Sequence, residues 1–167
     1  FGAGAVIAAH LKGQAVYDPA NQGALASIGY SYDLRYIEGP AGGAVGYRLL
    51  VYQNNTYYGG PMDDIYSNDW QSFSRTLSAS DFTRIAGSGP LKPDFSCSGA
   101  QMTFGYVSAN SHTTPGATQT KVSGLDNWCV KLSKAPPPAP LNPDFKLTAT
   151  VTSGNTTTFS LLAEPVD

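Results

Sequence analysis

The stretch that decides the fold is residues 27–36, which read SIGYSYDLRY. Every second side chain in it is large and apolar or aromatic, and the side chains between them are small or polar. Because successive side chains of a β-strand point to opposite faces of a sheet, this alternation predicts a strand with one buried face. A face of that size needs a second sheet to cover it. The buried face would consist of Ile28, Tyr30, Tyr32, Leu34 and Tyr36.

The same alternation recurs along most of the chain, with turn-forming residues between the runs. The runs occupy residues 5–17, 45–51, 71–77, 102–106 and 127–132. Asn54 and Asn55 lie between two extended segments and predict a hairpin. Ser78 followed by Asp81 is a weak helix-start signal and predicts one short helical turn within residues 79–85. The pattern therefore predicts an all-β fold, an immunoglobulin-like or jelly-roll β-sandwich, with very little helix.

Composition restricts the class of protein. The chain has 167 residues, 41% of them hydrophobic, which suffices for one compact domain with a core. Charged residues make up 13%, against about 25% in an average protein, a profile typical of extracellular β proteins. The net charge of -2 and the absence of Lys or Arg runs argue against nucleic acid as a partner. No apolar stretch is long enough for a transmembrane helix, and a chain that starts at Phe1 indicates a mature form after export.

The cysteines and the two glycosylation sequons also favour an extracellular protein. Cys97 and Cys129 are the only cysteines, and with no CxxC motif and two histidines a zinc site would lack ligands. We therefore expect a disulfide, which would stabilise the fold by about 3–4 kcal/mol and persist in an oxidising compartment. Asn54 and Asn155 each begin an N-x-T sequon and are candidate glycosylation sites. These features predict an extracellular or cell-surface location.

A proline-rich stretch divides the chain. Residues 135–140 read APPPAP, which lacks most backbone donors and favours a stiff extended segment. The tail beyond it alternates and predicts a hairpin, which is marginal in water unless something covers its apolar face. That cover is either the protein's own sandwich or another chain. The predicted organisation is an N-terminal strand at 1–17, a sandwich at 18–134, a linker at 135–144 and a hairpin at 145–167.

No catalytic, metal or cofactor site is predicted. Glu38 and Glu164 are the only glutamates, and neither falls in the middle of a sheet face where a glycosidase would need its carboxyl pair. The G-x-S-x-G motif of serine hydrolases is absent. Asp63, Asp64 and Asp69 could gather oxygen ligands for calcium, but without EF-hand spacing an acidic loop is more often simply solvated. We therefore expect a binding or assembling protein rather than an enzyme.

The segment from Trp70 to Leu132 carries a spaced set of short motifs, WQSFS, LSASDF, PDFS, SGAQMTFGY and LDNWCV. This pattern, over residues 24–132, resembles a domain that recurs in secreted and surface-anchored bacterial proteins. The resemblance implies a jelly-roll-like or laminin-G-like β-sandwich at the cell surface, and it implies little about function.

The N-terminal alternating strand resembles the donor strand of pilins that assemble by strand exchange. In that mechanism the N-terminal strand of one subunit completes the sheet of another. The alternative is that residues 5–17 pair within their own chain as the first strand of the sandwich. The predicted interface between subunits consists of Ile7, Ala9, Leu11, Ala15 and Tyr17 together with Phe145, Leu147, Val151, Phe159 and Leu161.

The function expected from these features is a structural subunit of an extracellular, pilus-like filament, a homopolymer whose partners are copies of itself. The alternative is a carbohydrate-binding or adhesive module that contacts surface glycans. Trp70 and Trp128 are expected to anchor the core. Rings for stacking on sugars would come from Tyr47, Tyr52, Tyr57, Tyr58 and Tyr66.

Overall fold

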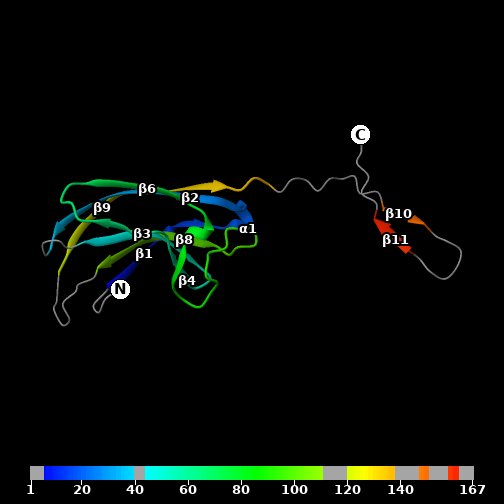
Figure 1. Ribbon diagram of the computed structural model, residues 1–167, viewed down its shortest axis with the longest axis horizontal. Helices are drawn as coiled ribbons and strands as arrows, with labels where there is room; N and C mark the ends of the chain where they lie inside the picture. Colours follow the sequence, from blue (N-terminus) through cyan, green and yellow to red (C-terminus); the bar gives the residue numbers. More distant parts are fainter. Residues whose placement is uncertain (1–5, 40–43, 111–119, 138–146, 151–157, 162–167) are drawn as a thin grey trace. The chain divides into compact units, whose positions relative to one another are not determined.

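The computed structural model describes residues 6–39, 44–110, 120–137, 147–150 and 158–161. The chain divides into two compact units, Phe1–Ala135 and Pro136–Asp167. The first unit contains two antiparallel sheets that pack face to face around one core (Figure 1). The predicted all-β sandwich is therefore confirmed.

The larger sheet has the strand order β1-β8-β3-β4-β7, with β5 pairing with the other part of β3. Its strands are β1 (Val6–Tyr17), β3 (Val45–Gln53), β4 (Thr56–Gly59), β5 (Asp63–Ile65), β7 (Thr83–Ala86) and β8 (Met102–Asn110). The smaller sheet has the order β6-β2-β9. Its strands are β2 (Leu25–Glu38), β6 (Gln71–Leu77) and β9 (Val122–Lys134).

The core lies between the two sheets, where the alternating face of β2 meets the inner face of β3. Ile28 and Leu34 of β2 have no solvent exposure, nor has Leu49 of β3. Each such side chain contributes about 1.5–3 kcal/mol when it leaves water. The tyrosines of β2 fill the space between them, and all five side chains predicted for this face are buried.

Two predictions from short local motifs are confirmed, the hairpin turn and the helical turn, although the helical turn ends well before residue 85. Asn54 and Asn55 have φ values of 49° and 55°, as a type I′ hairpin turn requires, and they join β3 to β4. The Ser78 side chain and backbone form a capping box with Asp81, but the helix is a single 3-10 turn, η1 (Ala79–Asp81). The residues after it form β7, because they pair with β4 instead of continuing the turn. A second short helix, α1 (Pro19–Gln22), links β1 to β2.

The predicted disulfide is not present, since Cys97 and Cys129 are both free. Cys129 lies opposite Ser31 in the β2–β9 ladder, whereas Cys97 follows Phe95, whose carbonyl oxygen accepts from the Leu25 amide. Leu25 and Ser31 are about 20 Å apart along the strand. Two residues of chain span at most about 7 Å, so the thiols cannot approach to disulfide distance. The disulfide prediction treated the strands that the two cysteines flank as neighbours, but Cys97 lies in a turn before β8, and β8 and β9 belong to different sheets.

The second unit contains the predicted hairpin. It consists of β10 (Leu147–Thr150) and β11 (Thr158–Leu161), which pair antiparallel with Leu147 opposite Leu161. Phe159 pairs with Ala149 in the same ladder. The other predicted interface residues of the tail, Phe145 and Val151, and the sequon at Asn155 lie outside the described residues.

Neither α1 nor η1, the helices among the described residues, has the length and apolar content to cross a bilayer.

Candidate functional site

The predicted interface strand β1 is the edge strand of the larger sheet. In the described part of the chain it forms a ladder only with β8, so one of its two backbone edges has no strand partner (Figure 1). The backbones of β1 and β8 are close at Gly105, where a Cβ would lie 2.0 Å from the carbonyl oxygen of His10. An exposed edge presents a row of N–H and C=O groups that can pair with another chain. The edge of β1 is therefore the first candidate for self-association.

A large bulge interrupts the ladder between β1 and β8. Leu11 pairs with Gly105 and Val16 pairs with Thr103, so residues 12–15 lie opposite a single residue of β8. An irregularity of this size removes these four residues from regular pairing and shifts the alternation of faces. Strand β1 therefore consists of a long N-terminal arm and a short C-terminal anchor.

The bulge divides the apolar face that the sequence predicted as continuous. Ile7, Ala9 and Leu11 pair with residues of β8 that face away from the core, whereas Tyr17 pairs with Met102 of the core. Ala15 also packs against the core. The five predicted interface residues of this strand thus lie on two faces. The prediction of one face was wrong because strict alternation holds only while the ladder is regular.

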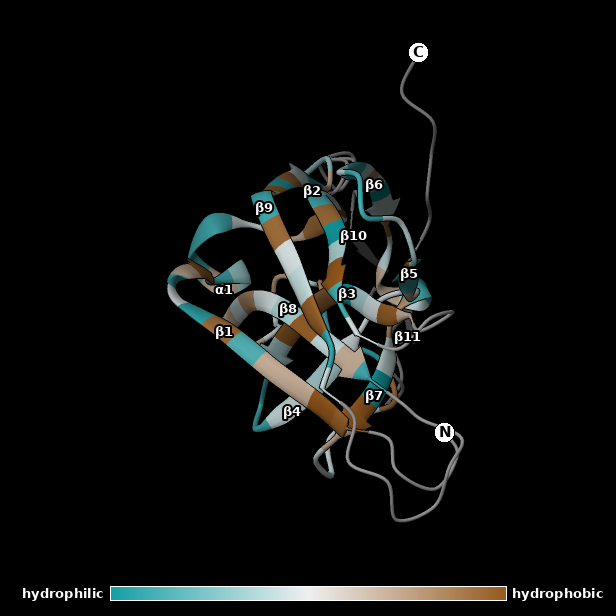
Figure 2. Cartoon of the chain, turned by 90° about the vertical axis from the view of Figure 1, so that its left-hand side faces the viewer, coloured by the Kyte–Doolittle hydropathy of each residue, from teal (hydrophilic) through white to brown (hydrophobic). Residues whose placement is uncertain are grey.

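The apolar side chains of the N-terminal arm, and that of Val16 just after the bulge, remain partly exposed to solvent. Val6, Ile7, Leu11 and Val16 are between 39% and 66% exposed, whereas Tyr17 is buried. Figure 2 shows apolar segments of β1, coloured brown, on the outside of the cartoon. Four exposed aliphatic side chains on one edge strand are a surface that association would cover.

The opposite face of the arm is held by an aromatic contact. The His10 ring stacks on Tyr106 with 4.7 Å between ring centroids, and its Nε2 lies 3.4 Å from the hydroxyl of Ser108. Tyr106 in turn lies 6.2 Å from the Tyr47 ring. This contact sets the position of the arm on β8, although the surrounding side chains of β1 bury little area.

A buried polar cluster joins the two sheets at β5, which pairs with β3 on the side away from β8. Asp63 of β5 accepts hydrogen bonds from the hydroxyls of Tyr30 and Tyr32, at 2.8 and 2.7 Å, and forms an ion pair with Arg75 of β6. Burial, followed by the bond to Asp63, raises the pKa of Tyr30 to about 12. Burial likewise raises the pKa of Tyr32, and the bond to Asp63 raises that of Arg75.

The same contacts determine where two carboxylates of the acidic loop lie. Asp63 points into the sandwich, and Asp64 follows it on the opposite face of β5, so the two carboxylates do not converge. Among the described residues no group of three potential metal ligands is present. Asp63 is instead a structural acceptor that ties β5 to β2 and β6.

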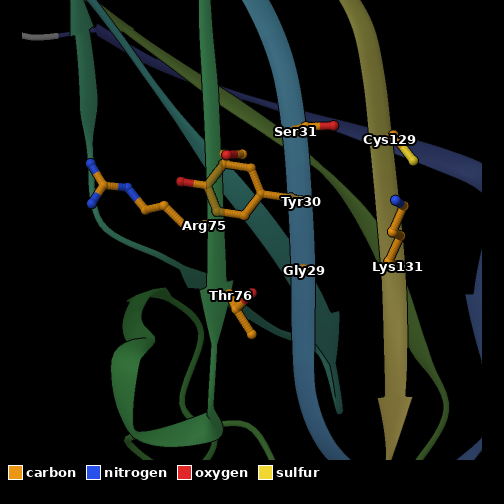
Figure 3. Close-up of a pocket in the computed structure, with 8 residues that line it drawn as sticks. Gly29, Tyr30, Ser31, Arg75, Thr76, Cys129 and Lys131 are labelled. Atoms are coloured by element: carbon orange, nitrogen blue, oxygen red, sulfur yellow. The ribbon is translucent and has the colours of Figure 1, made fainter.

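The outer face of the smaller sheet is hollowed above Gly29. The hollow has a volume of about 390 Å³ and is lined by residues of β2, β6 and β9. Figure 3 shows Ser31 and Cys129 on the opposite side of the sheet from the ring of Tyr30. Among its described lining residues there is no carboxylate, so the hollow offers no acid–base pair for glycoside hydrolysis.

Trp70 is a second correction, because it lies on the surface and not in the core. The residue is 47% exposed, and its ring lies under the guanidinium of Arg35 at 5.0 Å and covers Gly124. A Cβ at Gly124 would lie 2.8 Å from the ring, so any larger residue there would require the indole to shift. Trp128 packs against the core as predicted.

The tyrosines considered for sugar stacking fall into three groups. Tyr47 and Tyr58 are buried in the core, and the rings of Tyr52 and Tyr57 pack together across the β3–β4 hairpin, tilted by 49° with 4.7 Å between centroids. Tyr66 is the most exposed of the five, at 62%. Sequence alternation could not distinguish the buried tyrosines from the exposed ones, because it does not show which face of a strand packs against the rest of the protein.

Comparisons of the chain with protein-family models, with curated proteins and with solved structures find no match.

Proposed function

We propose that this protein is a structural subunit of an extracellular, pilus-like filament, in which β1 of one protomer pairs with β8 of the next. One observation carries the proposal: β1 is an edge strand whose aliphatic side chains remain largely exposed while its ladder is interrupted. A strand held in this way has a low cost of local opening, because few buried contacts are lost.

The bulge provides the hinge that such an exchange needs. Tyr17 is anchored, since its hydroxyl donates to the carbonyl oxygens of Gln22 and Gly23 at 3.1 and 2.8 Å. The anchor stays in its own chain while residues 6–11 leave β8. Together with the bulge, this arm spans about 33 Å when extended, which reaches across a neighbouring protomer.

The exchanged contacts are the same in the monomer and in the filament. In the monomer Ile7 pairs with Ala109 of its own chain, and in the filament it would pair with Ala109 of a neighbour in the same register. The balance between the two forms then depends on protein concentration and on the extra burial of the aliphatic side chains between protomers. The low charge of the chain and the exposed sequon at Asn54 on the β3–β4 turn support an extracellular setting.

Cysteine cross-linking tests the exchange directly. In a background with Cys97→Ser and Cys129→Ser, the pair Ile7→Cys and Ala109→Cys brings two thiols together across the β1–β8 ladder. Oxidation of assembled protein is expected to produce a covalent ladder in multiples of 17.6 kDa on non-reducing gels. Negative-stain electron microscopy of the same sample should show filaments.

The matched control places cysteines at Tyr52 and Tyr57, which pair within the β3–β4 hairpin and cannot exchange. That variant should cross-link only within one chain at every concentration. If the Ile7–Ala109 pair behaves like this control, with monomers alone on the gel and no filaments on the grid, the proposal is wrong.

A further inference from the structure

A second hollow, of about 410 Å³, lies on the outer face of the larger sheet beside β3 and β5. Its floor is Gly46, where a Cβ would lie 2.8 Å from the sulfur of Met62 and 2.9 Å from Oδ1 of Asp64. Any larger residue at this position would enter the space below these two side chains. The hollow thus exists because glycine occupies this point of β3.

One wall of the hollow is Arg48, a largely buried cation that forms no ion pair within the described part of the chain. Its side chain is 8% exposed, and its Nε is buried and makes no hydrogen bond. Within the described ranges no carboxylate forms an ion pair with it. The side chain passes over Gly59, where a Cβ would be 2.6 Å from Nε, and burial lowers the pKa of the guanidinium.

An unpaired buried charge costs stability, and an apolar side chain of similar length in its place is often neutral or stabilising. Arg48 therefore contributes little to the fold through its charge. A ligand carboxylate that entered the hollow would remove this cost, and it would meet the guanidinium in the planar, two-bonded geometry that arginine favours.

The remaining walls indicate what else the ligand carries. Asp64 lines the hollow without an ion pair to Arg48, so it is available to accept hydrogen bonds from hydroxyl groups. Tyr66, which is 62% exposed, offers a flat ring at the rim. Because Asp64 and Tyr66 are both exposed, the hollow is open to solvent and can take one unit of a longer chain.

We propose that this hollow binds an acidic sugar, a hexuronate unit of a glycan. Its carboxylate pairs with Arg48, its hydroxyls donate to Asp64, and its ring lies against Tyr66. This site is separate from the edge of β1 and does not depend on filament formation.

Titration of monomeric protein with sodium D-glucuronate, followed by NMR chemical shifts, tests the site, with D-glucose, acetate and glutamate as comparison ligands. Glucuronate is expected to bind saturably, at least tenfold more tightly than any of the three. Arg48→Met should weaken glucuronate binding tenfold or more. It should also leave the Tm of the free protein unchanged or higher, because the unpaired charge is gone.

Three further variants separate a binding role from a structural one. Arg48→Lys should weaken binding while retaining the charge, Gly46→Val should block the hollow, and Arg84→Met, which removes an exposed arginine on β7, should leave binding unchanged. Equal affinity for glucuronate and any comparison ligand would overturn the assignment. So would a lower Tm of ligand-free Arg48→Met, or normal glucuronate binding by that variant.

Discussion

The most quantitative prediction concerns the polar cluster between the sheets and the loss of stability caused by Asp63→Ala. The side chain of Asp63 is 1% exposed and accepts from Tyr30, Tyr32 and Arg75. Its removal leaves two buried tyrosine hydroxyls without an acceptor, at about 1–3 kcal/mol each. Arg75 adds little, because it is partly exposed and regains water. We expect a loss of about 3–5 kcal/mol, a large share of the 5–15 kcal/mol typical of a domain.

Urea unfolding followed by far-UV circular dichroism measures this loss. With a slope of about 1–3 kcal/mol/M, the midpoint should fall by roughly 2 M. In a Tyr30→Phe, Tyr32→Phe background the same aspartate substitution should cost clearly less, because the unpaired hydroxyls are absent. Asp69→Ala, at an exposed loop position, is the control and should change stability by no more than about 0.5 kcal/mol. A loss below about 1 kcal/mol for Asp63→Ala would refute the role of this cluster in joining the sheets.

Three other predictions concern pH, the edge strand and the cysteines. Because the pKa of Tyr30 is raised from 10 to about 12, its stabilising contribution is complete below pH 10 and is lost as the pH rises from about 10 to 12; urea unfolding at pH 8 and 11 measures this, and equal free energies would contradict it. Gly105→Ala places a Cβ against the His10 carbonyl oxygen, so amide exchange in β1 should accelerate at least tenfold while β3 is unaffected; unchanged exchange would show that β1 does not lie on β8 as described. Cys97 and Cys129 should together give two equivalents of thiol with DTNB without reductant, the exposed Cys97 reacting first, and fewer than two would indicate a disulfide.

Local sequence patterns predicted a strand well where it pairs regularly with its neighbouring strands and the other sheet covers one of its faces. The alternation of residues 27–36 identified the buried face of β2, and the pair Asn54–Asn55 identified the hairpin, since the required backbone conformation depends on those two residues alone. In β1 the same reasoning failed at residues 12–15. Gly13 is the one local signal, because a glycine inside a strand often marks a bulge, but the size of this bulge arises from how the strand fits β8.

The candidate sites were less accessible to prediction than the strands. Arg48 lies on β3 in an alternating run and looks like an ordinary surface cation, and its buried position depends on the space that Gly59 of β4 leaves for its side chain. Trp70 looks like a core residue because of its size, but the glycine at 124 on β9 gives it a place on the outer face.

What the amino-acid sequence determined by itself is the all-β class, the buried face of β2, the β3–β4 turn and the tail hairpin. Each depends on residues that are neighbours along the chain, where side-chain alternation and backbone preference act directly. The tertiary structure alone decided that β1 is an edge strand, that Cys97 lies in a turn far from Cys129 of β9, and that Arg48 is buried with no ion-pair partner among the described residues. These features depend on the order of strands in the sheets, and the same alternation is compatible with many strand orders.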